Sequence, residues 1–426
     1  MENRYDKYKD SGIAWIGEIP EHWNTYQLKR CSKFINGYAF NSNHFYKDKG
    51  IPVIRIGDIL HEQISFENIV YVQENNELEK FMAHKNDILI AMSGATVGKI
   101  GIYSTEDKVY INQRVGIIRT IQYNFIKRMF TTNGFVDYVN LSSAGSAQPN
   151  ISSEEILNFY IPAPSIKEQQ LIATYLDQKC SEIDELITLQ EEMITKLQSY
   201  KQSVITEAVT KGLDKNVPLK DSGIEWIGKI PEHWNTYQLK RCSKFINGYA
   251  FNSNHFNKDK GIPVIRIGDI LNEQISFENI VYVQENNELE KFIVHKNDIL
   301  IAMSGATVGK IGVYNSDDKV YINQRVGIIR TTQYNYIKRM FSTNGFIDYI
   351  NLSSAGSAQP NISSDGILNF HIPVPPLNEQ QTIADYLDQK CSEIDELISI
   401  KQQKIEKLKD YKKSLIFECA TGKRKV

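Results

Sequence analysis

The stretch that decides the fold is DSGIAWIGEIPEHWNTYQLKRCSKFINGYAFNSNHF at 10–45, which recurs as DSGIEWIGKIPEHWNTYQLKRCSKFINGYAFNSNHF at 221–256. The offset of 211 residues holds without a gap, and residues 10–160 differ from 221–371 at only 18 positions. Two copies are too few for a stacked solenoid. The repeat therefore predicts a tandem duplication of one binding module, although a duplication without functional consequence would leave the same trace.

Composition limits the class of protein. The chain has 426 residues, of which 41% are hydrophobic, and this fits two or three folded domains. No apolar run reaches the roughly 18 residues of a membrane helix, and the N-terminus lacks a signal core, so we expect a cytoplasmic protein. A net charge of −2 disfavours a protein that simply coats DNA. Any DNA binding would need local patches, direct base contacts or a partner.

The sequence offers no assembled catalytic or metal motif. The five cysteines form no CxxC pair, and the histidines form no HExxH, so neither a metal nor a cofactor is expected. In SGATVGK (93–99) the two glycines stand too close for a nucleotide P-loop, and Ile100 replaces the required hydroxyl. The [DNS]PP[YFW] motif of amino-methyltransferases is also absent. We therefore predict a chain that is not an enzyme.

The first 165 residues read as a mixed α/β domain. Short apolar runs ended by turn residues predict strands over 51–60, 86–94, 99–103 and 113–120. The segment 124–142 predicts a helix pair broken at a glycine. Proline-rich PAPS (162–165) and PVPP (373–376) end the globular part of each copy.

Each globular part is followed by a stretch with apolar residues at spacings of three and four, which is typical of a coiled-coil-like helix. In the first copy the predicted seam holds Leu176, Ile183, Leu186, Met193, Leu197, Tyr200 and Val204. In the second copy it holds Leu387, Ile394, Leu397, Leu408, Tyr411 and Leu415. One such helix is unstable alone in water, so we expect the two to pair antiparallel with pseudo-twofold symmetry. The alternative is that each helix packs only on its own globular domain.

The predicted organisation is therefore two duplicated α/β domains and two long antiparallel helices. The boundaries are 1–165 and 213–376 for the globular domains, 166–212 for the central helix, and 377–426 for the C-terminal helix and tail.

Five segments, each repeated in the second half, resemble the specificity subunits of type I restriction–modification systems. They are GEIPEHW (17–23), ILIAMSGATVGKIG (88–101), INQRVGIIR (111–119), GSAQPNIS (145–152) and IPAPSIKEQQLIATYLDQKCSEID (161–184). The resemblance implies two target recognition domains, each reading half of a split site in double-stranded DNA. It also implies helices that dock two modification subunits with adenine methyltransferase chemistry, and restriction subunits where the system has them.

The near identity of the two copies departs from the many specificity subunits whose two domains are dissimilar. Because twofold-related modules match inverted half-sites, we predict an interrupted inverted repeat as the target. A bivalent protein-binding scaffold without DNA readout is the alternative function. It predicts that the chain and its partner fail to retain duplex DNA at low salt.

Candidate DNA-binding residues combine amides, arginine, hydroxyls and aromatics in turn-rich segments. Asn and Gln suit adenine edges and Arg suits guanine, whereas a lysine beside a glycine turn suits a phosphate. In the first copy the candidates are Asn36, Tyr38, Asn41, Asn43, His44, Arg55, Ser93, Thr96, Lys99, Asn112, Gln113, Arg114, Ser146, Gln148 and Asn150. In the second they are Asn247, Tyr249, Asn252, Asn254, His255, Arg266, Ser304, Thr307, Lys310, Asn323, Gln324, Arg325, Ser357, Gln359 and Asn361.

Each candidate also has a structural interpretation. Tyr38 and its neighbour Phe40 could belong to the core, and Asn112–Arg114 could be a plain strand edge. The segment 142–150 could be an ordinary connector. Lys127 and Arg128, on a predicted helix, suit phosphates but could simply be solvated.

Overall fold

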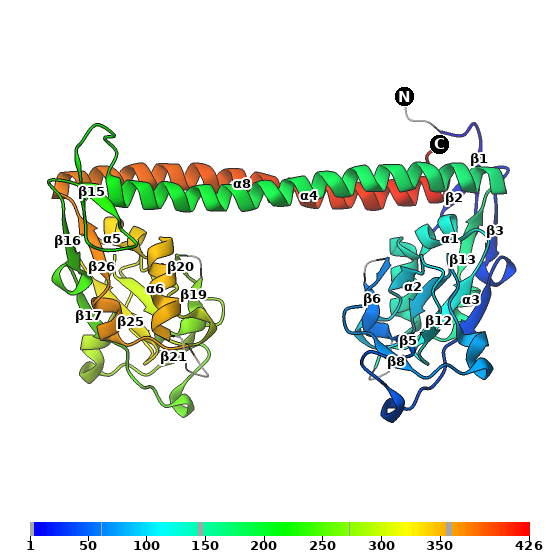
Figure 1. The fold of residues 1–426 in the computed structure, drawn as a ribbon, viewed down its shortest axis with the longest axis horizontal. Helices are drawn as coiled ribbons and strands as arrows, with labels where there is room; N and C mark the ends of the chain where they lie inside the picture. The colour runs from blue at the N-terminus through cyan, green and yellow to red at the C-terminus, as the bar shows by residue number, and fades with distance from the viewer. Residues whose placement is uncertain (1–3, 61, 144–147, 272, 355–359) are drawn as a thin grey trace. The chain divides into compact units, whose positions relative to one another are not determined.

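The computed structural model describes residues 4–60, 62–143, 148–271, 273–354 and 360–426. They form two compact units (Figure 1). Unit 1 comprises residues 1–190 and 403–426, and unit 2 comprises residues 191–402. Each unit contains one globular part and segments of two long helices.

The globular part of unit 1 is built on an antiparallel sheet in the order β10-β9-β12-β4. Its strands are β4 (Lys33–Asn36), β9 (Ile88–Ala91), β10 (Ile100–Ile102) and β12 (Val115–Arg119). A second sheet, in the order β11-β5-β8, consists of β5 (Ile51–Ile54), β8 (Val70–Val72) and β11 (Tyr110–Ile111). Ile54, Leu89 and Ile117 belong to one buried cluster, which joins the two sheets. Each of the four predicted segments contains a strand, but 51–60 is not one continuous strand, because β5 ends at Ile54.

Three short strand pairs complete the β-structure of unit 1. They are β1 (Tyr8–Asp10) with β2 (Glu18–Pro20), β6 (Ile59–Leu60) with β7 (Gln63–Ile64), and β3 (Asn24–Gln27) with β13 (Tyr160–Ala163). The last pair brings the end of the globular part back to its beginning, immediately before the long helix starts.

The helices of this part are α1 (Tyr123–Phe130), α2 (Asn133–Ser142) and α3 (Ser153–Asn158). The predicted helix pair is confirmed, but the predicted break at the glycine is wrong. Thr132 separates the helices and caps α2, because its side chain accepts a hydrogen bond from the Phe135 N–H. Gly134 lies inside α2 against Trp15, where an added Cβ would come within 2.2 Å of the indole ring. Close packing explains this glycine.

Unit 2 repeats the same order of elements. Its strands are β14 (Leu219–Asp221), β15 (Lys229–Pro231), β16 (Asn235–Gln238), β17 (Lys244–Asn247), β18 (Ile262–Ile265), β19 (Ile270–Leu271), β20 (Gln274–Ile275), β21 (Val281–Val283), β22 (Ile299–Ala302), β23 (Ile311–Val313), β24 (Tyr321–Ile322), β25 (Val326–Arg330) and β26 (His371–Val374). Its short helices are α5 (Tyr334–Met340), α6 (Asn344–Ser354) and α7 (Ser364–Leu368). The sheets run β17-β25-β22-β23 and β21-β18-β24.

The two long helices are α4 (Ile166–Lys211) and α8 (Leu377–Ala420). Figure 1 shows them side by side within each unit. In unit 1, Asp184 of α4 forms an ion pair with Lys412 of α8 at 2.7 Å, and in unit 2, Lys201 of α4 forms one with Asp395 of α8 at 2.7 Å. A lower number on one helix thus meets a higher number on the other. The segments are antiparallel, as predicted.

The two long helices make equivalent contacts in the two units. Positions that α4 supplies in unit 1 are supplied in unit 2 by their repeat equivalents on α8, and the reverse holds for α8. The core of unit 1 joins Ile172, Leu176 and Cys180 of α4 with Leu415, Ile416 and Cys419 of α8. The core of unit 2 joins Ile383, Leu387 and Cys391 of α8 with Val204, Ile205 and Ala208 of α4. Each residue in the second set is the repeat equivalent of one in the first. Each helix therefore belongs to both units, which excludes the alternative of packing only on its own domain.

The predicted apolar seam is only partly correct. Five of its residues are buried, namely Leu176, Ile183, Leu387, Ile394 and Leu415. Five others are between 43% and 57% exposed, namely Leu186, Met193, Tyr200, Leu397 and Tyr411. The remaining Leu197, Val204 and Leu408 are half-buried. A helix with 3.6 residues per turn drifts away from a strict heptad, so a single row of apolar residues does not stay on the inner face.

Two further observations concern the described part of the chain. None of the helices in the described ranges is long and apolar enough to cross a membrane. Among the same residues, no group of three or more His, Cys, Asp or Glu side chains is arranged to hold a metal ion.

Candidate nucleic-acid interface

Predicted segments that are distant in sequence are joined by backbone contacts in unit 1. Tyr38, just after β4, forms a parallel bridge with Asn112, just after β11. The Asn112 N–H in turn donates to the carbonyl of Ile54 at 2.9 Å. Because Arg55 follows Ile54 directly, three of the predicted segments meet at the ends of β4, β5 and β11.

The other two segments join the same region. The Met92 N–H donates to the carbonyl of Arg114 at 2.9 Å, which brings the end of β9 to the turn before β12. Ser93 then forms an antiparallel bridge with Asn150. The glycine turn, the Asn112–Arg114 turn and the loop ending at Asn150 are therefore neighbours. We treat this set of joined segments as the candidate interface of unit 1.

Unit 2 contains the same constellation. The equivalent contacts are the Tyr249–Asn323 bridge, the Ser304–Asn361 bridge, Asn323 N–H to Ile265 O at 2.9 Å, and Met303 N–H to Arg325 O at 2.9 Å. The two candidate interfaces thus have one backbone framework.

Many of the candidate side chains are exposed within this framework. The exposed ones in the first copy are Asn36, Tyr38, Asn41, Asn43, His44, Lys99, Gln113, Arg114, Gln148 and Asn150. Those in the second are Asn247, Tyr249, Asn252, Asn254, His255, Lys310, Gln324, Arg325 and Asn361. Asn112 and Asn323 are half-buried. Ser146, Ser357 and Gln359 lie outside the described residues.

Arg114 is the arginine best placed for an incoming ligand. It is exposed in the turn between β11 and β12, and its guanidinium has no partner among the described residues. Arg55 differs, because its guanidinium is held by Asp58 at 3.3 Å and by the Asn68 carbonyl at 2.6 Å. Arg55 is therefore already occupied in supporting the loop that it begins.

The glycine turn presents a lysine and conceals its hydroxyls. Gly94 and Gly98 have φ of 75° and 80°, a left-handed conformation that glycine adopts at little cost. Lys99 at the end of the turn is exposed. The hydroxyl oxygens of Ser93 and Thr96 are buried and have no hydrogen-bond partner among the described atoms. The same is true of Ser304 and Thr307. A direct contact from these hydroxyls would require the turn to move.

The aromatic part of the interface is a small cluster that sequence reasoning located incompletely. The Tyr38 ring is 40% exposed and packs against Phe40 at 5.0 Å and Phe81 at 5.1 Å between centroids. Lys80 lies over the Phe81 ring at 5.0 Å. Phe81 and Lys80 were not predicted, because no local sequence motif links them to Tyr38. Only the fold brings them together.

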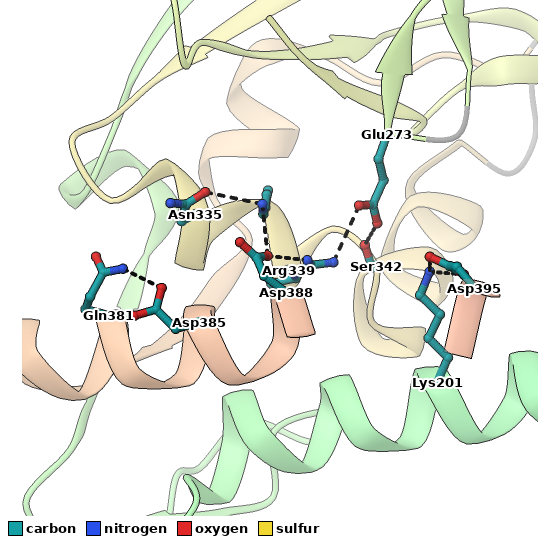
Figure 2. Close-up of polar contacts among 10 residues, drawn as sticks. Lys201, Glu273, Asn335, Arg339, Ser342, Gln381, Asp385, Asp388 and Asp395 are labelled. Carbon is teal, nitrogen blue, oxygen red and sulfur yellow. Dashed lines mark hydrogen bonds and ion pairs between the residues drawn. The ribbon is translucent and has the colours of Figure 1, made fainter. Parts of the chain in front are cut away.

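The prediction that Lys127 and Arg128 suit phosphates is wrong, and so is their alternative of simple solvation. Both form ion pairs with Asp177 of α4, at 3.0 Å and 2.5 Å. Figure 2 shows the equivalent site of unit 2, where Arg339 meets Asp388 of α8. Lys338, the neighbour of Arg339, also forms an ion pair with Asp388, at 3.1 Å. Burial alone would raise the pKa of Asp388, but hydrogen bonds and charges from the two cations hold the pKa below its ordinary value. These residues join the globular part to the helices.

Comparison with known proteins decides the family. The model of the type I restriction modification DNA specificity domain matches residues 20–198 and again residues 231–410. The chain belongs to this family. As a member of the type I DNA specificity family with two such domains, it is a DNA-specificity subunit and not itself an enzyme.

Relatives of similar length extend over nearly the whole chain. The type I restriction enzyme MjaVIII specificity subunit of Methanocaldococcus jannaschii is 24% identical over 96% of this chain and 94% of its own length. The EcoBI specificity subunit of Escherichia coli is 25% identical over 89% of this chain and 81% of its own length. These proteins are named as specificity subunits, in agreement with the resemblance noted in the sequence.

Solved structures support the fold of the family. A chain from the structural study of complex assembly and conformational transition of the type I R-M system matches with a TM-score of 0.74 and 16% identity, over 94% of this chain and 98% of that one. The HsdS subunit of Thermoanaerobacter tengcongensis matches with a TM-score of 0.54 and 17% identity, over 95% and 98%.

Proposed function

We propose that each unit of this specificity subunit reads one half of a bipartite DNA site through its candidate interface. The convergence of amides, an unpaired arginine and a lysine on one framework carries the proposal. Such groups read base edges in the major groove and anchor phosphates, and the two kinds of contact complement one another. In this proposal residues 1–165 and 213–376 are the recognition domains, and residues 166–212 and 377–426 supply the helices.

The two half-sites are proposed to have the same sequence. None of the 18 positions that differ between residues 10–160 and their copies is one of the candidate DNA-binding residues. The differences fall elsewhere, as at Val136/Ile347 and Phe125/Tyr336. Two interfaces with the same side chains on the same framework select the same bases.

The half-sites are further proposed to be inverted. The helix contacts of unit 1 recur in unit 2 with the copies exchanged. A pairing in which the same residues meet with the partners exchanged is isologous, and isologous modules match inverted repeats in DNA. The expected target is therefore an interrupted palindrome.

The partners in this proposal are double-stranded DNA, two modification subunits that methylate adenine, and restriction subunits in a cleaving complex. The solved structural relative comes from the assembly of a type I R-M system, which supports such a complex. The net charge of −2 agrees with shared DNA binding, because neutralising phosphates normally supplies a large part of affinity. Because the site that it is proposed to read lies in the DNA of the cell, we propose a cytoplasmic location for the chain.

The deciding experiment is to co-express the chain with its modification subunit in an unmethylated host and to map methyladenine across the genome. A split inverted-repeat motif that disappears when the chain is omitted is the expected result. A split but asymmetric motif would preserve the function and reject the symmetry argument. No new methylation, from a soluble and intact complex, would reject DNA readout in favour of a protein scaffold.

A further inference from the structure

Each recognition domain is joined to its long helix by one buried arginine. In unit 1, Arg128 of α1 donates to Asp177 of α4 at 2.5 Å and to Glu62, in the β6–β7 turn, at 3.4 Å. The Arg128 side chain is only 7% exposed. The arginine thus connects a turn of the globular part with the helix through one planar group.

Unit 2 has the same joint with additional bonds (Figure 2). Arg339 contacts Asp388 of α8 and, at 3.5 Å, Glu273. Here the Ser342 hydroxyl also donates to Glu273 at 2.7 Å. Thr131 stands at the equivalent position of unit 1, and its hydroxyl donates instead to the Arg128 carbonyl at 3.0 Å.

A second difference adds a bond between the globular part and α4 in unit 2. The buried Tyr336 hydroxyl of α5 lies 3.3 Å from the carbonyl of Val209 on α4, and 3.1 Å from that of Pro373. Phe125 occupies this position in unit 1 and has no hydroxyl to donate. Unit 1 has other bonds at the end of α8, where the Tyr8 hydroxyl donates to the Gly422 carbonyl at 3.1 Å and Lys423 donates to the Glu18 carbonyl at 3.0 Å.

The chemistry of the joint controls angle as well as contact. A guanidinium is planar and donates in fixed directions, whereas an ammonium acts as a point charge. Because the arginine is buried and bound from two sides, the domain cannot tilt on its helix without breaking a charge-assisted hydrogen bond. Lys127 adds a second cation on Asp177 at 3.0 Å, and Lys338 does so on Asp388 at 3.1 Å.

We propose that Arg128 and Arg339 are positioning residues that set how many base pairs between the half-sites the complex accepts. This inference rests on the proposed function. Each base pair added between half-sites moves the second one by about 3.4 Å and turns it by about 34° around the duplex. A domain held at a fixed angle cannot bind a half-site that is displaced in this way. A domain that is free to tilt can follow part of the displacement.

The test removes the helix side of the joint while preserving its shape. The variant is Asp177→Asn with Asp388→Asn, prepared as the full complex with the modification subunit. The matched control is Glu182→Gln with Glu393→Gln, which makes the same charge change on the same two helices but removes only ion pairs with Lys179 and Lys390, outside the joint. The readout is the affinity ratio between duplexes of native spacing and duplexes one base pair longer or shorter. The duplexes carry the half-sites found by methylation mapping.

We expect the aspartate variant to lower this ratio at least tenfold and the control to leave it within twofold. An unchanged ratio in the aspartate variant would overturn the proposal, whatever happens to absolute affinity or thermal stability. An equal fall in both variants would also overturn it, because the effect would then reflect general loosening. If the aspartate variant does not fold, Lys127→Met with Lys338→Met must lower the ratio in the same direction, and an unchanged ratio there overturns the proposal. Absence of wild-type methylation would instead refute the proposed function.

Discussion

Replacement of Arg114 by alanine tests the assignment of the readout surface most directly. The side chain is exposed and has no partner among the described residues, so its loss should change the free energy of unfolding by no more than about 0.5 kcal/mol. A bidentate arginine–guanine contact contributes about 1–3 kcal/mol of discrimination, which corresponds to roughly a 5- to 150-fold loss of specific affinity. Arg325 is the equivalent residue in the other unit. Because separate sites act additively, the double variant should lose about 2–6 kcal/mol.

The assay is binding of the complex with its modification subunit to duplexes that carry the mapped motif, a single-base variant of it, or unrelated sequence, at several salt concentrations. If Arg114 reads a base, the alanine variant binds the motif and the single-base variant equally at the affected position. If it contacts a phosphate, binding weakens uniformly and the salt slope falls by about one. The control is Arg30→Ala with Arg241→Ala, which removes exposed arginines outside the interface. Unchanged binding in the Arg114 variant, or an equal loss in the control, would refute the assignment.

Three further predictions concern stability. Burial raises the pKa of Glu168, but hydrogen bonds from His22, Ser165 and Trp23 lower the pKa to about 2. The stabilisation from the ionised Glu168 is therefore complete above about pH 4.5 and is lost as the pH falls towards 2. Glu168→Gln should therefore lower the free energy of unfolding by about 1–2 kcal/mol at pH 7, with allowance for solvent screening, and by less at pH 3; an equal urea-unfolding effect at both pH values would contradict this. Tyr336→Phe should destabilise unit 2 by about 1–3 kcal/mol, because the hydroxyl that bonds two buried carbonyls is lost. The measurement is hydrogen exchange in unit 2, which the control variant Phe125→Leu, at a position without a hydroxyl, should not change. Unaltered exchange in the Tyr336 variant would exclude the bond. Gly134→Ala should lower the melting temperature despite the better helix propensity of alanine, because its Cβ overlaps an indole ring; a higher melting temperature would show that the ring moves aside freely.

The sequence was sufficient for the architecture because its strongest signals are long-range or highly periodic. The duplication is visible by comparing the two halves of the sequence directly. The proline pairs mark where each long helix begins. The residues on the inner face of the helices were harder to predict from the sequence. Leu186 and Met193 fit an apolar row as well as Cys180 does, yet only Cys180 faces the core. The choice depends on packing against both the other helix and the globular part.

The candidate interface was predictable as a set of segments but not as an assembled surface. Amides and arginine predicted Asn112–Arg114 as DNA contacts with a strand edge as the alternative, and the structure places Gln113 and Arg114 exposed in a turn before β12. Its position beside Ile54 depends on the parallel pairing of β11 with β5, which no local pattern encodes. For the same reason, Arg55 could not be distinguished from Arg114 until Asp58 was seen to hold it. Arg128 looked like a surface cation because its partners lie 49 and 66 residues away.

The exchange of helix segments has a consequence for how the chain is made. Unit 2 is one continuous stretch, residues 191–402, whereas unit 1 is finished only by residues 403–426. The core of unit 1 waits for Leu415, Ile416 and Cys419, which are synthesised only after the whole of unit 2. At about 10 residues per second, this delay lasts about 20 seconds after residue 190 is added. The domain that is translated first is therefore completed after the second one, and its apolar helix face must be kept from aggregation throughout that interval.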